Sequence, residues 1–283
     1  MKSKLILLEG VPGSGKSTAG ETLLRFFKDK DLRARFWREG DFEHPADFEG
    51  IACLNKSQFE DLVSRHTDLV ELFQEHTSIR GDDFLLKYRK LQSSYPERID
   101  QTLLDELSCL DVYDGLPMED YCRLALDRWQ DFGEMASKSD DVVILECCFL
   151  QNPLTGMFAR HDAAPRVVTK QIEKITAIIR ELDPLVIYLL PLDVKATLWH
   201  VHAERPKEWA DFVIWYLTGQ AYGGSHHLHG YEGVIQFYEM RQKFEVELLR
   251  RLPIEHLIVE HSGNEWERCD GEIRTFVSPF FLG

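Results

Sequence analysis

The feature that most constrains the fold of this chain is a glycine-rich loop near its amino terminus. Residues 4–9 (KLILLE) form a short apolar run that predicts a β-strand, and the loop that follows reads GVPGSGKS over residues 10–17. Beyond the loop, Leu23, Phe26 and Phe27 recur at helical spacing. A strand, a glycine loop and a helix in this order predict an α/β fold whose loop surrounds an anion at the positive end of the helix.

The loop fits the pattern G-x-x-x-x-G-K-S, known as Walker A, and its positions have separate physical roles. The glycines permit a tight turn and a close approach of the backbone, so that the N–H groups of residues 13–17 can ring a phosphate. Lys16 can reach the outer phosphates of a nucleotide, and the Ser17 hydroxyl can ligate Mg²⁺. We therefore expect ATP and Mg²⁺ as cofactors. The expected cofactor-binding residues are Gly10, Pro12, Gly13, Ser14, Gly15, Lys16, Ser17 and Thr18.

Four further apolar runs predict the other strands of a sheet. They cover residues 34–38, 141–148, 184–190 and 256–260. Near-continuous apolar runs separated by helical segments are typical of parallel sheets buried on both faces. We predict a P-loop NTPase fold of the α/β class, a doubly wound parallel sheet of about five strands, in a single domain over residues 1–283.

The segment between the second and third predicted strands carries apolar residues at helical spacing. We predict a helical insert over residues 50–138, without a second sheet, on the substrate side of the domain. Its three helical stripes are Phe59 to Val70, Leu103 to Leu110 and Tyr121 to Phe132. A second segment, residues 199–233, ends in a glycine- and histidine-rich stretch and predicts a lid with a mobile loop.

The charge balance bears on the partners of this chain. Its formal net charge of -15 repels nucleic acid and anionic membrane surfaces, so we expect neither as a partner. We expect a small-molecule substrate, and formation of a homodimer is possible. Only four apolar residues lie between Lys4 and Glu9, too few for a signal peptide or a membrane span, so we expect the cytoplasm.

The chain resembles the P-loop kinases of the nucleoside and nucleotide kinase group, and thymidylate kinase-like proteins in particular. The resemblance rests on residues 8–18 (LEGVPGSGKST) and, more weakly, on 184–189 (PLVIYL) and 204–206 (ERP). Within that group the chain is most similar to uncharacterised bacterial members. The resemblance implies an ATP-dependent phosphotransferase that acts as a small-molecule kinase.

The resemblance also implies an acid after the second strand that contacts the acceptor hydroxyl. Glu39 and Asp41 occupy that place, and we favour Asp41, with Glu39 as the alternative. A carboxylate there can accept the hydroxyl proton as the phosphoryl group transfers. A solvated turn with no catalytic role is the competing interpretation of the same residues.

Two more site residues follow from the later strands. Glu146 ends the apolar run 142–145 as the acidic Walker B position does, and we expect it to hold Mg²⁺ together with Ser17. A structurally paired strand-end glutamate is the alternative. Related kinases often carry arginine directly after this acid, whereas Cys147 stands here, so a phosphate-binding arginine must come from elsewhere or be absent. Arg205 is the expected lid arginine that stabilises the transition state.

These residues predict transfer of the ATP γ-phosphoryl group to a small-molecule acceptor. The acceptor is a nucleoside, a nucleotide or an antibiotic-like hydroxyl compound, and the choice of ATP over GTP is left open. The alternative is a nucleotide-operated switch or regulatory ATPase that acts on a protein partner through the insert. A nucleotide-binding domain that has lost catalysis is a third interpretation.

Overall fold

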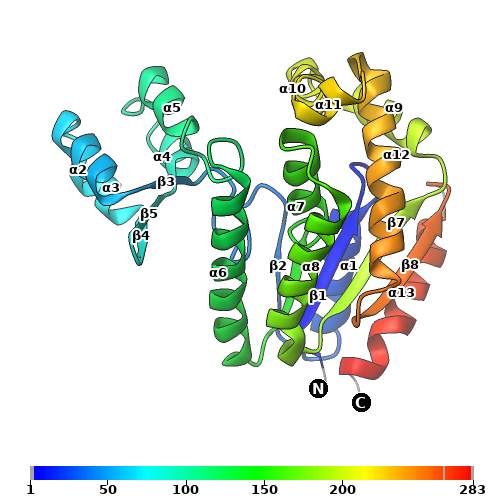
Figure 1. Cartoon of the computed structure of the whole chain (residues 1–283). Helices are drawn as coiled ribbons and strands as arrows, with labels where there is room; N and C mark the ends of the chain where they lie inside the picture. The colour runs from blue at the N-terminus through cyan, green and yellow to red at the C-terminus, as the bar shows by residue number, and fades with distance from the viewer. Residues whose placement is uncertain (1–2, 264, 282–283) are drawn as a thin grey trace. The chain divides into compact units, whose positions relative to one another are not determined.

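The computed structural model describes residues 3–263 and 265–281, which divide into two compact units. The first unit joins the amino-terminal segment that ends at Glu39 to the segment that begins at Leu126. The second unit is Gly40–Ala125, while the sequence predicted an insert over 50–138. Figure 1 shows the chain coloured by residue number, and each unit is described below by itself.

Five parallel strands form the central sheet of the first unit, in the order β2-β6-β1-β7-β8 (Figure 1). Each strand coincides with one of the five apolar runs, so the predicted parallel sheet is confirmed. The strands are β1 (Leu5–Gly10), β2 (Ala34–Trp37), β6 (Val142–Glu146), β7 (Leu185–Pro191) and β8 (Glu255–His261). Because β1 is flanked by β6 and β7, the strand order reverses at β1, where open α/β sheets bind their ligands.

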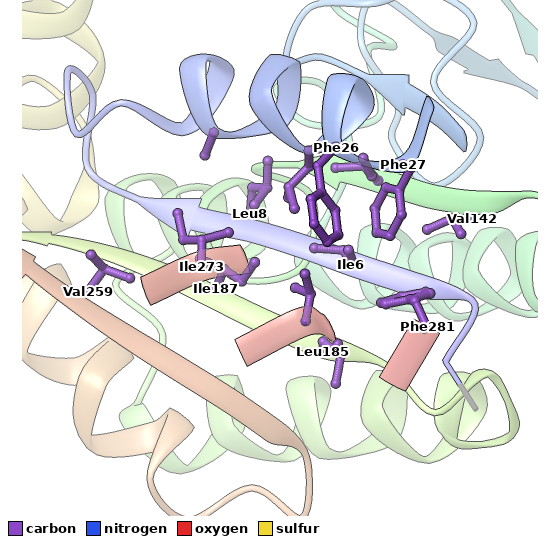
Figure 2. Packing of buried hydrophobic residues seen from close by; sticks show 14 of the residues in the cluster. Ile6, Leu8, Phe26, Phe27, Val142, Leu185, Ile187, Val259, Ile273 and Phe281 are labelled. Carbon is purple, nitrogen blue, oxygen red and sulfur yellow. The ribbon is translucent and has the colours of Figure 1, made fainter. Parts of the chain in front are cut away.

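One face of this sheet packs against helices from the two ends of the chain. Ile6 and Leu8 of β1 are fully buried against Phe26 and Phe27, which lie on α1 (Figure 2). The helices of this layer are α1 (Lys16–Lys28) and α13 (Trp266–Phe281). Burial of alternate strand residues against these helices makes this layer a hydrophobic core of the first unit.

The opposite face of the sheet is covered as well, so the sheet is doubly wound. Tyr188 alternates with Ile187 and Leu189 along β7, and its hydroxyl donates to Glu245 of α12. The other helical segments of this unit are the latter part of α6 (Met118–Ser137), α7 (Gln151–Thr155), a π-helical turn (Gly156–Arg160), α8 (Pro165–Ile179), a 3₁₀ turn (Arg180–Leu182), α9 (Val194–Glu204), α10 (Lys207–Thr218), α11 (Ala221–Ser225) and α12 (Gly230–Leu249). The predicted lid, 199–233, therefore covers the end of α9, all of α10 and α11, and the start of α12.

The second unit has its own core and a small sheet of its own. Its strands pair antiparallel in the order β3-β5-β4, and they are β3 (Ala52–Leu54), β4 (Thr77–Arg80) and β5 (Asp83–Leu86). Its helices are α2 (Lys56–Arg65), α3 (Val70–Glu75), α4 (Tyr88–Ser94), α5 (Gln101–Ser108) and the first part of α6. The prediction of helices without a second sheet is wrong here. Strands of three or four residues are too short to show the alternation that separates strand from helix in a sequence.

None of the described helices combines the length and the apolar character that crossing a membrane requires.

Candidate nucleotide site

The glycine loop connects β1 to α1 with a backbone that only glycine adopts easily. Gly10, Gly13 and Gly15 have φ angles of 144°, 79° and 94°. A Cβ atom on Gly10 would lie 2.5 Å from the carbonyl oxygen of Leu189, and one on Gly13 would lie 2.4 Å from a Val201 methyl carbon. The loop is therefore pressed closely against β7 and α9, as a loop must be when its N–H groups surround a ligand.

Lys16 is the first residue of α1, and its side chain is buried at the loop. Its Nζ donates to two carbonyl oxygens at the start of the loop, at 3.2 Å and 3.0 Å. Burial by itself lowers the pKa of this ammonium group, but the neighbouring Cys147, Glu39 and Glu146 outweigh burial and raise the pKa. Lys16 is thus a charged donor that lies beside two carboxylates.

Glu146 meets the first turn of α1 because β6 pairs with β1 in parallel, with Glu146 opposite Leu8. The Ser17 hydroxyl donates to Glu146 Oε1 at 2.8 Å. The backbone N–H of Glu39 also faces this carboxylate, yet the buried Oε2 atom has no hydrogen bond within residues 3–263 and 265–281. Burial raises the pKa of Glu146, while Lys16 and Ser17 act in the other direction. A buried carboxylate oxygen without a donor is available to a cation.

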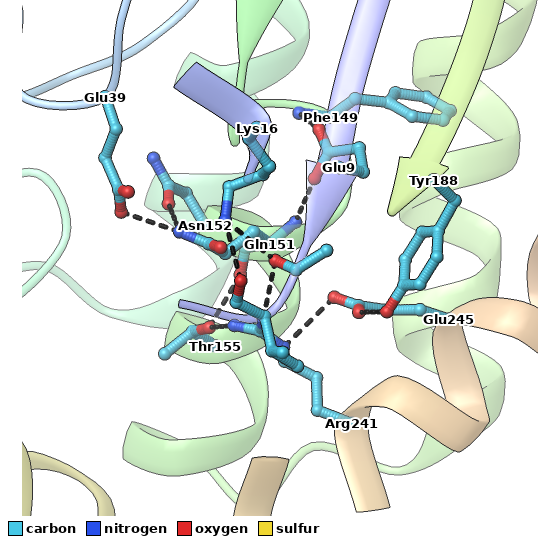
Figure 3. A network of polar contacts seen from close by, with 12 residues as sticks. Glu9, Lys16, Glu39, Phe149, Gln151, Asn152, Thr155, Tyr188, Arg241 and Glu245 are labelled. Atoms are coloured by element: carbon cyan, nitrogen blue, oxygen red, sulfur yellow. Dashed lines mark hydrogen bonds and ion pairs between the residues drawn. The ribbon is translucent and has the colours of Figure 1, made fainter. Parts of the chain in front are cut away.

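Glu39 follows β2 and lies beside the same edge of the sheet. Its Oε1 accepts a hydrogen bond from Gln151 Nε2 at 2.6 Å (Figure 3). Its Oε2 accepts one from the Cys147 thiol at 3.3 Å. The donor atoms of Glu39, Glu146 and Cys147 all lie within 4.8 Å of one another. Two carboxylates next to the Ser17 hydroxyl are the hard oxygen ligands that Mg²⁺ prefers, so the residues fit the ion.

Glu9, the last residue before the loop, ties the glycine loop to the segment after β6. Its two carboxylate oxygens accept the backbone N–H groups of Phe149 and Gln151, each at 2.9 Å (Figure 3). The side chain is fully buried, and this burial raises its pKa to about 7, although the two N–H groups oppose the shift. The position of Gln151, and through it that of Glu39, therefore depends on Glu9.

A second buried charge network lies on the other side of the loop. Arg241 of α12 forms an ion pair with Glu245 one helical turn further on, and Glu245 accepts a hydrogen bond from the Tyr188 hydroxyl at 2.5 Å (Figure 3). Arg241 also donates to the Thr155 hydroxyl at 2.6 Å and to the carbonyl oxygen of Gly10 at 3.4 Å. This network joins the sheet, α7 and α12 to the start of the loop.

Other residues predicted for the site take no part in the hydrogen bonds and ion pairs described above. Asp41 belongs to the second unit, where its Oδ1 accepts the backbone N–H of Glu43 at 2.9 Å within a turn. Arg205 ends α9 with an exposed side chain, and no contact of its guanidinium is found in the described part of the chain. Pro12 is half-buried and Thr18 is exposed.

No protein-family model matches this chain, and no curated protein sequence matches it. Among the solved structures similar to this chain is a thymidylate kinase from Candida albicans, 13% identical, with a TM-score of 0.44, and the alignment covers 98% of this chain and 92% of that one. A likeness of this size assigns neither a substrate nor a site residue to this chain.

Several residues of the site carried no sequence signal strong enough to identify them. Glu9 and Gln151 meet although 142 residues separate them, and Arg241 meets Gly10 from 231 residues away. Glu9 alone carried a hint of its role, because it is a charged residue near the end of an otherwise apolar, buried strand. The contacts of Arg241 depend on how α12 packs on the sheet, which periodicity alone does not specify.

We predict a pH-dependent stability effect of Glu9. Its pKa of about 7 lies above the ordinary value of 4.5, so the folded chain holds this proton more tightly than the unfolded chain does. The contribution of Glu9 to the free energy of unfolding therefore falls as pH rises from 4.5 through about 7. In urea denaturation, the free energy of wild type minus that of Glu9→Gln should fall by about 1 kcal/mol between about pH 6 and about pH 8. A difference that does not change with pH would show that Glu9 does not titrate in this range.

Proposed function

We propose that this protein is an ATP-dependent phosphotransferase that transfers the γ-phosphoryl group to a hydroxyl of a small molecule. The observation that carries the proposal is the hydrogen bond between Ser17 and Glu146, with Glu39 next to it and Lys16 beside both. An anion-binding loop alone supports phosphate binding. The addition of two carboxylates at its edge supports phosphoryl transfer, which needs a metal site and an acceptor site beside the phosphates.

The loop binds the phosphates of ATP in this proposal. The backbone N–H groups of residues 13–17 lie at the amino-terminal end of α1, where the helix dipole favours negative charge. Lys16 reaches the β- and γ-phosphates when its Nζ leaves the loop carbonyls that it now contacts. Its raised pKa keeps the ammonium group charged at neutral pH. Phosphate oxygens are better partners for it than neutral carbonyls, because both charges then take part in the hydrogen bond.

Ser17 and Glu146 hold Mg²⁺ in this proposal. The support is the fit of two oxygen donors that already touch, one of which belongs to a buried carboxylate with an unpaired oxygen. When bound, Mg²⁺ neutralises charge on the transferred phosphoryl group. The protein's own contribution is to place Glu146 beside Lys16, whose charge opposes the rise in the pKa of Glu146 on burial, and to orient the carboxylate through Ser17.

Glu39 is the residue that we assign to the acceptor. Gln151 and Cys147 each donate to one of its oxygens, and this fixes the direction of the carboxylate. Such a carboxylate can accept the proton of a hydroxyl as its oxygen attacks the γ-phosphorus. An acceptor phosphate needs no base and would be repelled by Glu39, so the site favours a hydroxyl acceptor.

Asp41 becomes the alternative to Glu39 for the acceptor, and Arg205 keeps its predicted role as a proposal of lower rank. Asp41 is two residues from Glu39, and its side chain already accepts a hydrogen bond within a turn. Arg205 ends the helix α9 that packs on Gly13, which supports its role as a lid arginine for the transition state. The insert 50–138 as the substrate side and the lid 199–233 are part of the same proposal.

The function is tested by formation of ADP from ATP, or of GDP from GTP, in the presence of a broad acceptor panel. The panel contains nucleosides, nucleotides and amine-bearing hydroxyl compounds, and each is assayed with ATP, with GTP and without Mg²⁺. We expect Mg²⁺-dependent ADP formation that rises at least about 10-fold with one hydroxyl acceptor and is lost in Lys16→Met. ADP formation that depends on Lys16 and responds to no acceptor would contradict the kinase proposal and favour the regulatory ATPase.

The assignment of Glu39 over Asp41 has its own test. Glu39→Gln keeps the shape of the side chain but removes its basicity, so kcat should fall by about 100-fold or more while the affinity for ATP changes little. Asp41→Asn is the matched variant, and we expect it to retain most of wild-type kcat. A larger loss in Asp41→Asn than in Glu39→Gln would return the role to Asp41.

A further inference from the structure

Arg241 is an almost completely buried arginine, and its burial needs an explanation. Its side chain is 1% exposed, and that of its ion-pair partner Glu245 is fully buried. Replacing a buried ion pair by apolar side chains of similar size is often neutral or stabilising, so stability alone is a weak reason for this pair. The guanidinium also lies close to Lys16, because both cations donate to the carbonyl oxygen of Gly10. The nearby carboxylates offset part of the repulsion between these two cations, and an anion bound at the loop would offset more of it.

The contacts of Arg241 fix the guanidinium against the first carbonyl of the loop (Figure 3). Nη1 donates to the Thr155 hydroxyl at 2.6 Å, Nη2 donates to the Gly10 carbonyl at 3.4 Å, and the group stacks 4.9 Å from the Tyr238 ring centroid. Nε lies 3.1 Å from Glu245 Oε1. Anchors from the loop, α7 and α12 thus hold one planar group, which costs little further ordering when a ligand binds.

The Gly10 carbonyl is the point where the two cations meet. It accepts Lys16 Nζ at 3.2 Å as well as Arg241 Nη2 at 3.4 Å. A lysine that turns to a phosphate must give up this carbonyl. Arg241 is then the donor that keeps the carbonyl turned away from the ligand, and a loop whose carbonyls point outward directs its N–H groups inward.

We propose that Arg241 is the second cation of the phosphate site and a positioning residue for the glycine loop. It supplies a positive charge from α12 to the start of the loop, through its contacts with Thr155 and the Gly10 carbonyl. This inference rests on the proposed function for its consequence in catalysis, but its first consequence is the affinity for a polyphosphate. Loss of Arg241 should weaken the binding of ATP and of inorganic pyrophosphate alike, because it acts on the loop and not on the base.

The experiment removes the charge without leaving its partner unpaired. Arg241→Met alone would strand Glu245 in the core, so the informative variant is Arg241→Met/Glu245→Gln, in which residue 245 can still accept the Tyr188 hydroxyl. Arg250→Met, exposed at the end of the same helix, is the matched control. Isothermal titration with pyrophosphate and with ATP gives the affinities, and thermal unfolding gives the state of the fold.

We expect the double variant to unfold within a few degrees of wild type while its affinities for pyrophosphate and ATP fall by about 30-fold or more. Arg250→Met should match wild type in both. Affinities within about 3-fold of wild type in a folded double variant would overturn the proposal and leave Arg241 a structural residue. If the double variant does not fold, Arg241→Lys decides, because lysine keeps the charge opposite Glu245 but cannot reach Thr155 and Gly10 together. About 10-fold weaker pyrophosphate binding at an unchanged unfolding midpoint supports the proposal, and unchanged binding refutes it.

The outcome is separable from that of the proposed function. Wild type that binds ATP but transfers nothing to any acceptor would end the kinase proposal, while the pyrophosphate titration would still confirm or refute the role of Arg241.

Discussion

The parallel pairing of β1 with β6 is the constraint on which the site depends. This register places Glu146 opposite Leu8, two residues before the glycine loop, so the strand-end carboxylate meets the first turn of the helix that follows the loop. The pairing of β2 with β6 then brings the segment after Trp37, and with it Glu39, to the same edge. A one-residue shift in a register would turn Glu146 to the other face of the sheet and separate Ser17 from its acceptor.

The balance of charge around the loop explains why so many ionisable groups near it have shifted pKa values. Lys16 and Arg241 face Glu39, Glu146 and Glu245, all close to a loop whose backbone dipoles favour anions. Burial makes each of these charges costly by itself, and the ion pairs and hydrogen bonds offset that cost only in part. An arrangement with cations on the loop side and carboxylates at the sheet edge suits a ligand that brings a polyphosphate together with a metal ion. It suits a neutral ligand poorly.

Much of the fold could be predicted from the sequence because its signals are local. The five strands are short apolar runs, and the loop pattern requires a strand before it and a helix after it. The three strands of the second unit could not be predicted, because they are too short and, in β4, too exposed to show the alternation of a strand. The pairing of Ser17 with Glu146 followed from the chain order of strand ends, since both lie at the carboxyl edge of one parallel sheet.

The remaining site residues are set by tertiary packing. Nothing in the sequence around Arg241 distinguishes it from the exposed Arg250 in the same stretch, and only the contact of α12 with β7 through Tyr188 and Glu245 brings it to the loop. The contacts of Gln151 and Cys147 likewise could not be predicted from the sequence, because they depend on how Glu9 binds the backbone after β6. From the sequence we favour Asp41 over Glu39, whereas the hydrogen bonds of Glu39 give the stronger physical argument for Glu39.

We propose that Ser17 and Glu146 bind the metal ion of a nucleotide site. Mn²⁺ binding followed by electron paramagnetic resonance tests this proposal most directly. Wild type saturated with ATP should bind one Mn²⁺ per chain, and Glu146→Gln should bind it about 10- to 100-fold more weakly while the affinity for metal-free ATP stays the same. Mn²⁺ affinity in Glu146→Gln equal to that of wild type would contradict the account.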